Sequence, residues 1–308
     1  MDDTIALVGS PTALGGHFAG MERTPGVLRA AGLVDRVMAR PGLARATLVD
    51  HGDAPNDPGW APDADARAKN RTLISGYLPR LAGHVRVALR PSVRSRLLVI
   101  GGDCTSHAGA MAGLKQADPD RRLAIAWFDA HGDFNTPATT PSGNVWGMPF
   151  AMLLGRGDWD LVDASDGPTA LEEDAALLGG QVLDETESRM LAASGVAHFG
   201  AGMLGGEAGL AALAAWAAIV AARCDGLYVA FDLDAIDASE DLALAMPEPD
   251  GISLDTAVAA VTLLAASIPV VGFGATAVMA QPGLSLDPTL AAIARLAEAA
   301  LTSPDRGA

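Results

Sequence analysis

Two short stretches of the sequence carry acids and a histidine at alternate positions, each directly after an apolar run. Asp129, His131 and Asp133 follow AIAWF in FDAHGDFN. Asp232 and Asp234 follow LYVAF in VAFDLDAID. Residues two apart in an extended chain point to the same face, so each stretch presents its polar groups together. Four carboxylates and one imidazole suit a hard divalent metal, or two metals that share carboxylates. Solvated acids at strand ends are the alternative, but two such patterns at separate strand ends favour metal binding.

The elements that must position these residues are strands and helices in alternation. Continuous apolar, β-branched runs separated by Ala- and Leu-rich stretches predict a parallel sheet covered by helices on both faces. The fold class is therefore α/β, a three-layer αβα arrangement around a mostly parallel, doubly wound sheet, with residues 1–308 as one domain. The expected strands are 5–9, 46–50, 96–102, 123–129, 196–202, 227–232 and 269–274, and the expected helices are 65–90, 106–116, 186–194, 206–223, 253–266 and 287–302.

Three chemically suggestive segments follow expected strands. GGDC (101–104), DAHGD (129–133) and FDLD (231–234) each begin where an apolar run ends. Ligand sites of open parallel sheets lie beyond the carboxyl ends of the strands, so the three segments are expected to converge there. Residues 52–64 and 137–149 are rich in Pro, Gly, Asp and Thr and are expected to be loops. The second loop directly follows DAHGD, which makes it a natural substrate loop.

Composition excludes several classes of protein. The net charge is −16, which argues against nucleic acid and anionic membranes as partners, because phosphate binding needs clustered Lys and Arg. Two cysteines make no disulfide framework, and the acidic N-terminus MDDTIALVGS does not resemble a secretory signal, so a cytoplasmic location is expected. The apolar stretch 210–222 is too short to span a bilayer and predicts a buried helix.

GGDC, DAHGD and FDLDAID resemble, in this order, the metal-binding segments of the ureohydrolase family of arginase, agmatinase and formimidoylglutamase. The likeness begins at IALVGSPTALGG near the N-terminus and ends at VVGFG (270–274). It implies two Mn²⁺ per chain and hydrolysis of a linear amidino C–N bond, in arginine or a modified arginine such as N-hydroxyarginine. It also implies a homo-oligomer, a trimer or a hexamer, with a small amino-acid or guanidino compound as substrate.

The resemblance also implies roles for the acids. By position, Asp129 and Asp232 would bridge the two metals, and His131 and Asp234 would complete one site. Asp133 would complete the other site and act in catalysis by orienting the attacking water.

Cys104 falls where the family has its remaining histidine ligand. A thiolate there adds a negative charge and a softer donor, which shifts the metal preference from Mn²⁺ towards Zn²⁺ or Fe²⁺. The alternatives are a small buried thiol outside the coordination sphere, or a substitute ligand in His107.

The segment NTPATTPSGN (135–144) is similar to the arginase branch of the family. There the positions of Asn135, Ser142 and Asn144 hold the substrate's α-carboxylate, and Asp184 matches the acid that meets the α-amino group. A plain turn is the alternative reading of this Thr-, Pro- and Ser-rich run.

Three positions depart from the family. Trp146 replaces the proton-shuttling histidine, Ala277 replaces the glutamate that holds the guanidinium, and Met246 replaces a threonine. Loss of a general acid–base group typically costs about 10²–10⁴ in rate. A catalytically impaired protein that binds a small amino acid or a partner subunit, or a hydrolase of another C–N bond, therefore stands as an alternative function.

Overall fold

The strands within the described residues lie in one parallel sheet. In a computed structural model, which describes residues 3–56, 65–90, 95–281 and 283–302, eight strands follow the order β2-β1-β3-β8-β7-β4-β5-β6. Each neighbouring pair is parallel, so the expected mostly parallel sheet is parallel throughout the described residues. The strands are β1 (Asp3–Ser10), β2 (Ala46–Asp53), β3 (Arg96–Gly101), β4 (Leu123–Asp129), β5 (Ala175–Gly179), β6 (Ala197–Gly200), β7 (Gly226–Asp232) and β8 (Val270–Thr276).

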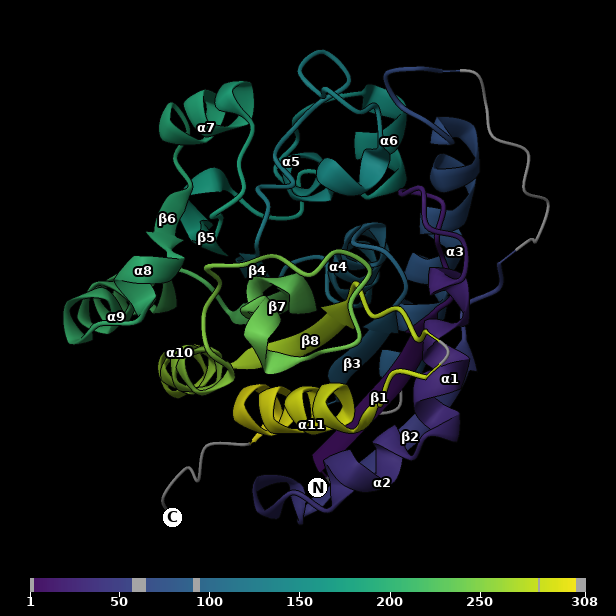
Figure 1. Ribbon diagram of the computed structural model, residues 1–308, viewed down its shortest axis with the longest axis vertical. Coiled ribbons are helices and arrows are strands. Elements are labelled where there is room, and N and C mark those ends of the chain that lie inside the picture. The colour runs from purple at the N-terminus through teal and green to yellow at the C-terminus, as the bar shows by residue number, and fades with distance from the viewer. Residues whose placement is uncertain (1–2, 57–64, 91–94, 282, 303–308) are drawn as a thin grey trace.

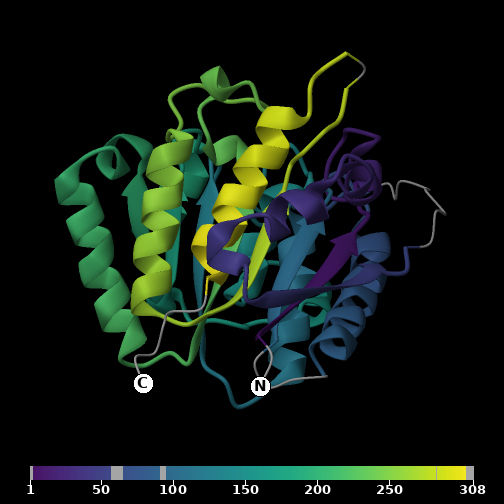
Figure 2. The ribbon, with the colours of Figure 1, turned by 90° about the horizontal axis from the view of Figure 1, so that it is seen from below.

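Helices cover both faces of this sheet and form the three expected layers (Figures 1 and 2). One apolar core lies between the sheet and α1, α2 and α8–α11, and a second lies under α3–α7. The α-helices are α1 (Thr24–Ala30), α2 (Leu33–Met38), α3 (Arg71–Leu89), α4 (Thr105–Ala117), α5 (Pro149–Leu153), α6 (Trp159–Ala164), α7 (Glu185–Ala192), α8 (Ala201–Leu204), α9 (Glu207–Ala221), α10 (Leu254–Ser267) and α11 (Asp287–Leu301).

The middle of the sheet positions the chemistry. β3, β8, β7 and β4 are neighbours, and their side chains are almost entirely buried because helices pack on both faces. Since all strands are parallel, their carboxyl ends form one edge. GGDC, DAHGD and FDLD therefore leave the sheet side by side, as the sequence predicts.

Several boundaries differ from the sequence-based expectations. β5 was not expected, since AALLG is short and carries only Ala, Leu and Gly. The helix expected over 65–90 begins at Arg71, because residues just before it bind the 137–144 loop through the Lys69 N–H and the Gly143 carbonyl. The loop expected at 52–64 lies partly in β2, and residues 57–64 fall outside the described residues.

The helix expected over 210–222 is present as part of α9, but the expectation that it is buried is wrong. α9 lies near the β6 end of the sheet (Figure 1) and buries one stripe, Gly209, Leu213, Ala217 and Val220, while Ile219 is 60% exposed. An edge helix has a single neighbour-facing side, and its alanines add little apolar area to the other side. No helix within the described residues combines the length and apolarity that crossing a bilayer requires.

Candidate metal centre and substrate cavity

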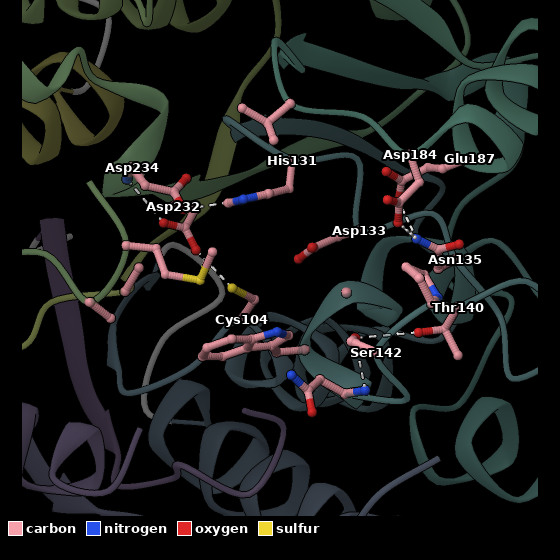
Figure 3. A pocket seen from close by; sticks show the side chains of 18 of the residues that line it. Cys104, His131, Asp133, Asn135, Thr140, Ser142, Asp184, Glu187, Asp232 and Asp234 are labelled. Atoms are coloured by element: carbon pink, nitrogen blue, oxygen red, sulfur yellow. Dashed lines mark hydrogen bonds and ion pairs between the residues drawn. The ribbon is translucent and has the colours of Figure 1, made fainter. Parts of the chain in front are cut away.

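Two neighbouring strands bring the central acids together. Phe128 of β4 pairs with Phe231 of β7, so the next residues, Asp129 and Asp232, lie beside each other at the carboxyl edge. Cys104 reaches the same place from the end of β3, where it stands directly before α4. Figure 3 shows Cys104, His131, Asp232 and Asp234 gathered at one end of the cavity.

These residues form two overlapping groups of ligand atoms. Sγ of Cys104 and carboxylate oxygens of Asp129 and Asp232 lie within 4.8 Å of one another. Oxygens of Asp129 and Asp234 and a ring nitrogen of His131 satisfy the same limit. Asp129 belongs to both groups, which is the arrangement that two metals sharing one carboxylate require.

Backbone and indole donors fix the carboxylates. Asp129 accepts hydrogen bonds from the His131 N–H at 2.7 Å and from the Trp127 indole at 2.9 Å. Asp232 accepts from the Asp234 N–H at 3.0 Å, and Asp234 accepts across the strands from the Ala130 N–H at 3.1 Å. These donors lie at the strand ends, so each carboxylate is held in its orientation even when no cation is bound.

Cys104 faces the acids, and His107 does not. The Cys104 thiol donates to Asp232 Oδ2 at 2.7 Å, so it is not packed only against apolar side chains. His107 is completely buried behind the cluster, where its ring contacts the Tyr228 hydroxyl at 2.9 Å and the Thr276 hydroxyl at 3.0 Å. Both His107 nitrogens are therefore occupied by hydroxyl groups, which leaves Cys104 as the donor from the β3 end.

Asp133 carries an orphaned acceptor. Its carboxylate is buried, and Oδ2 has no hydrogen-bond partner within the described residues. Figure 3 shows this carboxylate pointing into the cavity from a backbone position with φ of 47°. Asp133 lies outside the two tight groups, but a buried carboxylate oxygen without a donor fits a site that takes a cation.

Burial, and after it the charges of neighbouring groups, shifts the pKa values of the cluster. Burial, followed by neighbouring acids, raises the pKa of Asp133 and of Asp232, and it raises the pKa of Asp234 to about 6. Burial opposes the charge of His131, but hydrogen bonds to Asp129 and Asp234 outweigh it and raise that pKa. Burial also raises the pKa of the Cys104 thiol, and the acids add to this effect. A divalent cation would favour the deprotonated form of each of these groups and so reverse every one of these shifts, which means that the donor set fits metal.

The cluster opens into a cavity of about 310 Å³ whose other polar residues come from the 135–144 loop, from the start of α7 with its N-cap Asp184, and from His17. Asn135 Nδ2 donates to Asp184 at 3.1 Å, and the Asn144 N–H donates to Ser142 Oγ at 3.2 Å. All four residues expected to bind the amino-acid head group therefore line one cavity. Thr140 lines it as well (Figure 3).

Sequence reasoning missed Glu187. It is buried, lines the cavity and accepts hydrogen bonds from the Phe134 N–H at 2.9 Å and from Asn135 Nδ2 at 3.3 Å. Burial raises its pKa. A Cβ on Gly132 would lie 2.5 Å from the Glu187 carboxyl carbon, so the glycine in DAHGD makes room for it. The available signal was the spacing of Glu187 three residues after Asp184, on one face of a helix.

An apolar wall lines another part of the cavity. Three of the positions that depart from the family, Trp146, Met246 and Ala277, line it together with Met21. A Cβ on Gly16 would overlap the Trp146 ring, so the indole lies against a bare backbone. No Lys or Arg is among the described residues that line the cavity, so its ionisable side chains are carboxylates, histidines and Cys104. The end of the cavity that holds Cys104, His131, Asp232 and Asp234 is called the metal end below.

The fold and the site define an αβα protein whose cavity, at the carboxyl edge of a parallel sheet, gathers two groups of candidate metal ligands. Comparison with known proteins narrows this class. The Arginase family model matches residues 3–302, so the chain belongs to the arginase family. It is 31% identical to the arginase of Bacillus subtilis (strain 168) over 259 residues, 82% of each protein.

Solved structures agree with this assignment. The native arginase of Bacillus caldovelox superposes with a TM-score of 0.85 at 26% identity, covering 99% of this chain and 100% of that one. Arginase from Bacillus subtilis subsp. subtilis str. 168 superposes with a TM-score of 0.83 at 28% identity, covering 99% and 100%. The resemblance and the fold predicted from the sequence are thereby confirmed, and the chain is an arginase-family hydrolase.

Proposed function

We propose that the protein is a metal-dependent amidinohydrolase that acts on a modified arginine, with N-hydroxyarginine preferred over arginine. One observation carries the proposal: two ligand groups that share Asp129 lie in the same cavity as a set of polar residues suited to an amino-acid head group. A pair of divalent cations at those groups would supply a Lewis acid and lower the pKa of bound water.

The proposed metals are two Mn²⁺ per chain, with Zn²⁺ or Fe²⁺ favoured to the extent that the Cys104 sulfur coordinates. The proposed ligands lie together at the carboxyl edge of the sheet. They are Cys104, Asp129, His131, Asp133, Asp232 and Asp234. The orphaned Oδ2 of Asp133 supports its inclusion.

Asp133 is the proposed catalytic residue. Its Oδ2 can accept a proton from the attacking water and hold that water against the planar carbon of the substrate. Asp184 would bind the α-ammonium group, and Asn135, Ser142 and Asn144 would bind the α-carboxylate. These contacts fix the scissile C–N bond relative to the metal end, which is where orientation contributes to rate.

The apolar wall determines the preferred substrate. A guanidinium group beside Trp146 and Ala277 forfeits a charge-assisted hydrogen bond worth about 1.5–3 kcal/mol. A substrate that brings its own metal-binding oxygen offsets part of that loss. The same wall favours one further candidate, hydrolysis of another C–N bond such as an amide or formimino group.

The test combines metal analysis with product release. Protein loaded with Mn²⁺, Zn²⁺ or Fe²⁺ is expected to hold two ions per chain and to release hydroxyurea from N-hydroxyarginine faster than urea from arginine. Fast hydrolysis of plain arginine would contradict the substrate preference. Bound metal without release from any guanidino compound would favour another C–N bond, and protein without metal would favour a non-catalytic amino-acid- or partner-binding role.

We also propose a homo-oligomer, a trimer or a hexamer, in the cytoplasm. The family resemblance and the acidic composition support this, and a monomeric mass by light scattering at micromolar concentration would contradict it.

A further inference from the structure

Lys69 is exposed, contacts Asn144 of the cavity lining, and is one of only two lysines in the 308 residues. Its Nζ donates to Asn144 Oδ1 at 3.1 Å, and its backbone N–H donates to the Gly143 carbonyl at 2.9 Å. The side chain extends from the segment before α3, which sequence reasoning assigned to a helix. A cation is therefore fixed beside a residue that lines the cavity.

The segment that carries Lys69 is clamped onto the 135–144 loop. Arg67 Nη1 donates to the carbonyls of Pro137 and Ala138 at 3.1 and 3.2 Å. Gly143 has φ of 73°, and a Cβ there would overlap the Ala66 carbonyl oxygen. The position of Lys69 is thus set by contacts along the whole segment, of which its own ammonium makes only one.

Lys69 also sets the orientation of its neighbours. An ammonium group only donates, so the oxygen of the Asn144 amide faces Lys69 and its nitrogen faces His17 Nδ1, at 3.1 Å. His17 Nδ1 must then accept, which leaves the ring proton on Nε2. His17 and Asn144 both line the cavity, so Lys69, Asn144 and His17 form one ordered polar chain beside it.

Charge explains what this cation could bind. The cavity lining contains five carboxylates, Asp133, Asp184, Glu187, Asp232 and Asp234, and its described residues include no Lys or Arg. Figure 3 places Asp184 and Ser142 at opposite ends of a row of polar side chains. Asp133, Asp232 and Asp234 belong to the proposed metal ligands, and Asp184 can meet an α-ammonium group. An α-carboxylate beside Ser142 has no such charged partner among the described lining residues, so a cation near it would strengthen its binding. Lys69 is that cation.

We propose that Lys69 recognises the α-carboxylate of the substrate, together with Ser142 and Asn144, and so selects a free amino acid over its decarboxylated counterpart. The inference rests on the head-group pocket of the proposed function. The ammonium has three donors on a flexible stem, so it can bind a carboxylate and keep Asn144 oriented.

The test is ligand binding by titration calorimetry, with L-ornithine and its decarboxylated counterpart putrescine as probes. Lys69→Met is expected to weaken L-ornithine binding about tenfold or more and to leave putrescine binding unchanged. Lys69→Arg keeps the charge and is expected to restore most of the ornithine affinity. The matched control is Lys115→Met, since the other lysine only caps the end of α4 through the carbonyls of Pro119 and Arg121.

Equal losses for both probes, or no loss for ornithine, would overturn the proposal, provided that thermal melts show each variant folded. So would a failure of the unaltered protein to bind ornithine. These measurements need no turnover, so failure of the hydrolase proposal would appear in the product assays alone, and failure of the Lys69 proposal in the binding assays alone.

Discussion

The two ends of the cavity are built differently. At the metal end, Asp129, Asp232 and Asp234 are held by N–H groups of the same strand ends that carry them. At the other end, Gly16, Trp146 and Lys69 are held by contacts between loops that lie far apart in the sequence. The strand ends position the proposed metal ligands, and the loops form the part of the cavity that is proposed to bind the substrate. The loops can therefore diverge from the family while the metal end keeps its acids.

A substitution at the metal end is the strongest way to break this division. Asp129→Asn removes the one carboxylate shared by both ligand groups, so both metals are expected to be lost. Removing a hydrogen-bond partner of a metal ligand typically lowers the metal affinity by about 10–100-fold, and removing Asp129 itself should lower it by more. Metal content by mass spectrometry, with exposed Asp255→Asn as control, checks this result. Two ions retained in Asp129→Asn would contradict the shared role.

Restoring the family's residues at the loop end tests the other half of the comparison. Trp146→His together with Ala277→Glu returns a proton-transfer group and an anion for the guanidinium. Urea release from arginine is expected to rise about 10²–10⁴-fold, with each single variant gaining less. Unchanged arginine turnover in a folded, metal-loaded double variant would show that the wall does not control substrate choice.

The acid cluster predicts an unusual pH dependence for the metal-free protein. Burial and then the charge of Asp129 raise the pKa of Asp234 to about 6, so the folded chain holds this proton more tightly than the unfolded chain. That stabilisation is complete below about pH 4 and is lost as the pH rises through 6, a change on the order of 3 kcal/mol. Asp133, Asp232 and His131 act in the same direction, because the pKa of each is raised.

Urea denaturation at pH 4.5, 6 and 7.5 in the presence of a chelator measures this loss. Saturating Mn²⁺ should abolish the decline, since a bound cation favours the ionised acids. A stability that stays flat or rises with pH in the chelated protein would contradict the electrostatic description of the cluster.

Cys104→His gives the smallest expected effect. It removes a soft donor and one negative charge, so the ratio of Mn²⁺ to Zn²⁺ affinity should rise about tenfold. Competition between the two metals measures this ratio. Cys224→Ala, which changes the other buried thiol far from the cavity lining, should leave the ratio as it is. An unchanged ratio in Cys104→His would remove Cys104 from the ligand set.

The metal end of the cavity could be predicted from the sequence far better than the loop end. Asp129, His131 and Asp232 stand at alternate positions directly after apolar strands, so local spacing placed them correctly at the carboxyl edge. The short strand β5 carries no β-branched residue, and its existence depends on pairing with β4.

The loop end depends on contacts that no local pattern records. The Trp146 N–H donates to the Gly15 carbonyl at 3.0 Å, and Asn70 Nδ2 donates to the Leu14 carbonyl at 2.8 Å. Such contacts join segments separated by more than fifty residues. Lys69 could not be predicted for this reason, because it gains its place only through another segment. Glu187 offered only its spacing from Asp184, and its role becomes clear through its contacts with Phe134 and Asn135.

The Cys104–Asp232 hydrogen bond has a consequence for oxidation. Thiolates, rather than thiols, react with peroxide and alkylating reagents, and burial beside acids raises the pKa of Cys104. Without metal, the sulfur therefore stays protonated and inert, and 8% exposure restricts access further. If Cys104 is a ligand as proposed, the metal-free protein would keep this donor reduced and able to bind metal again.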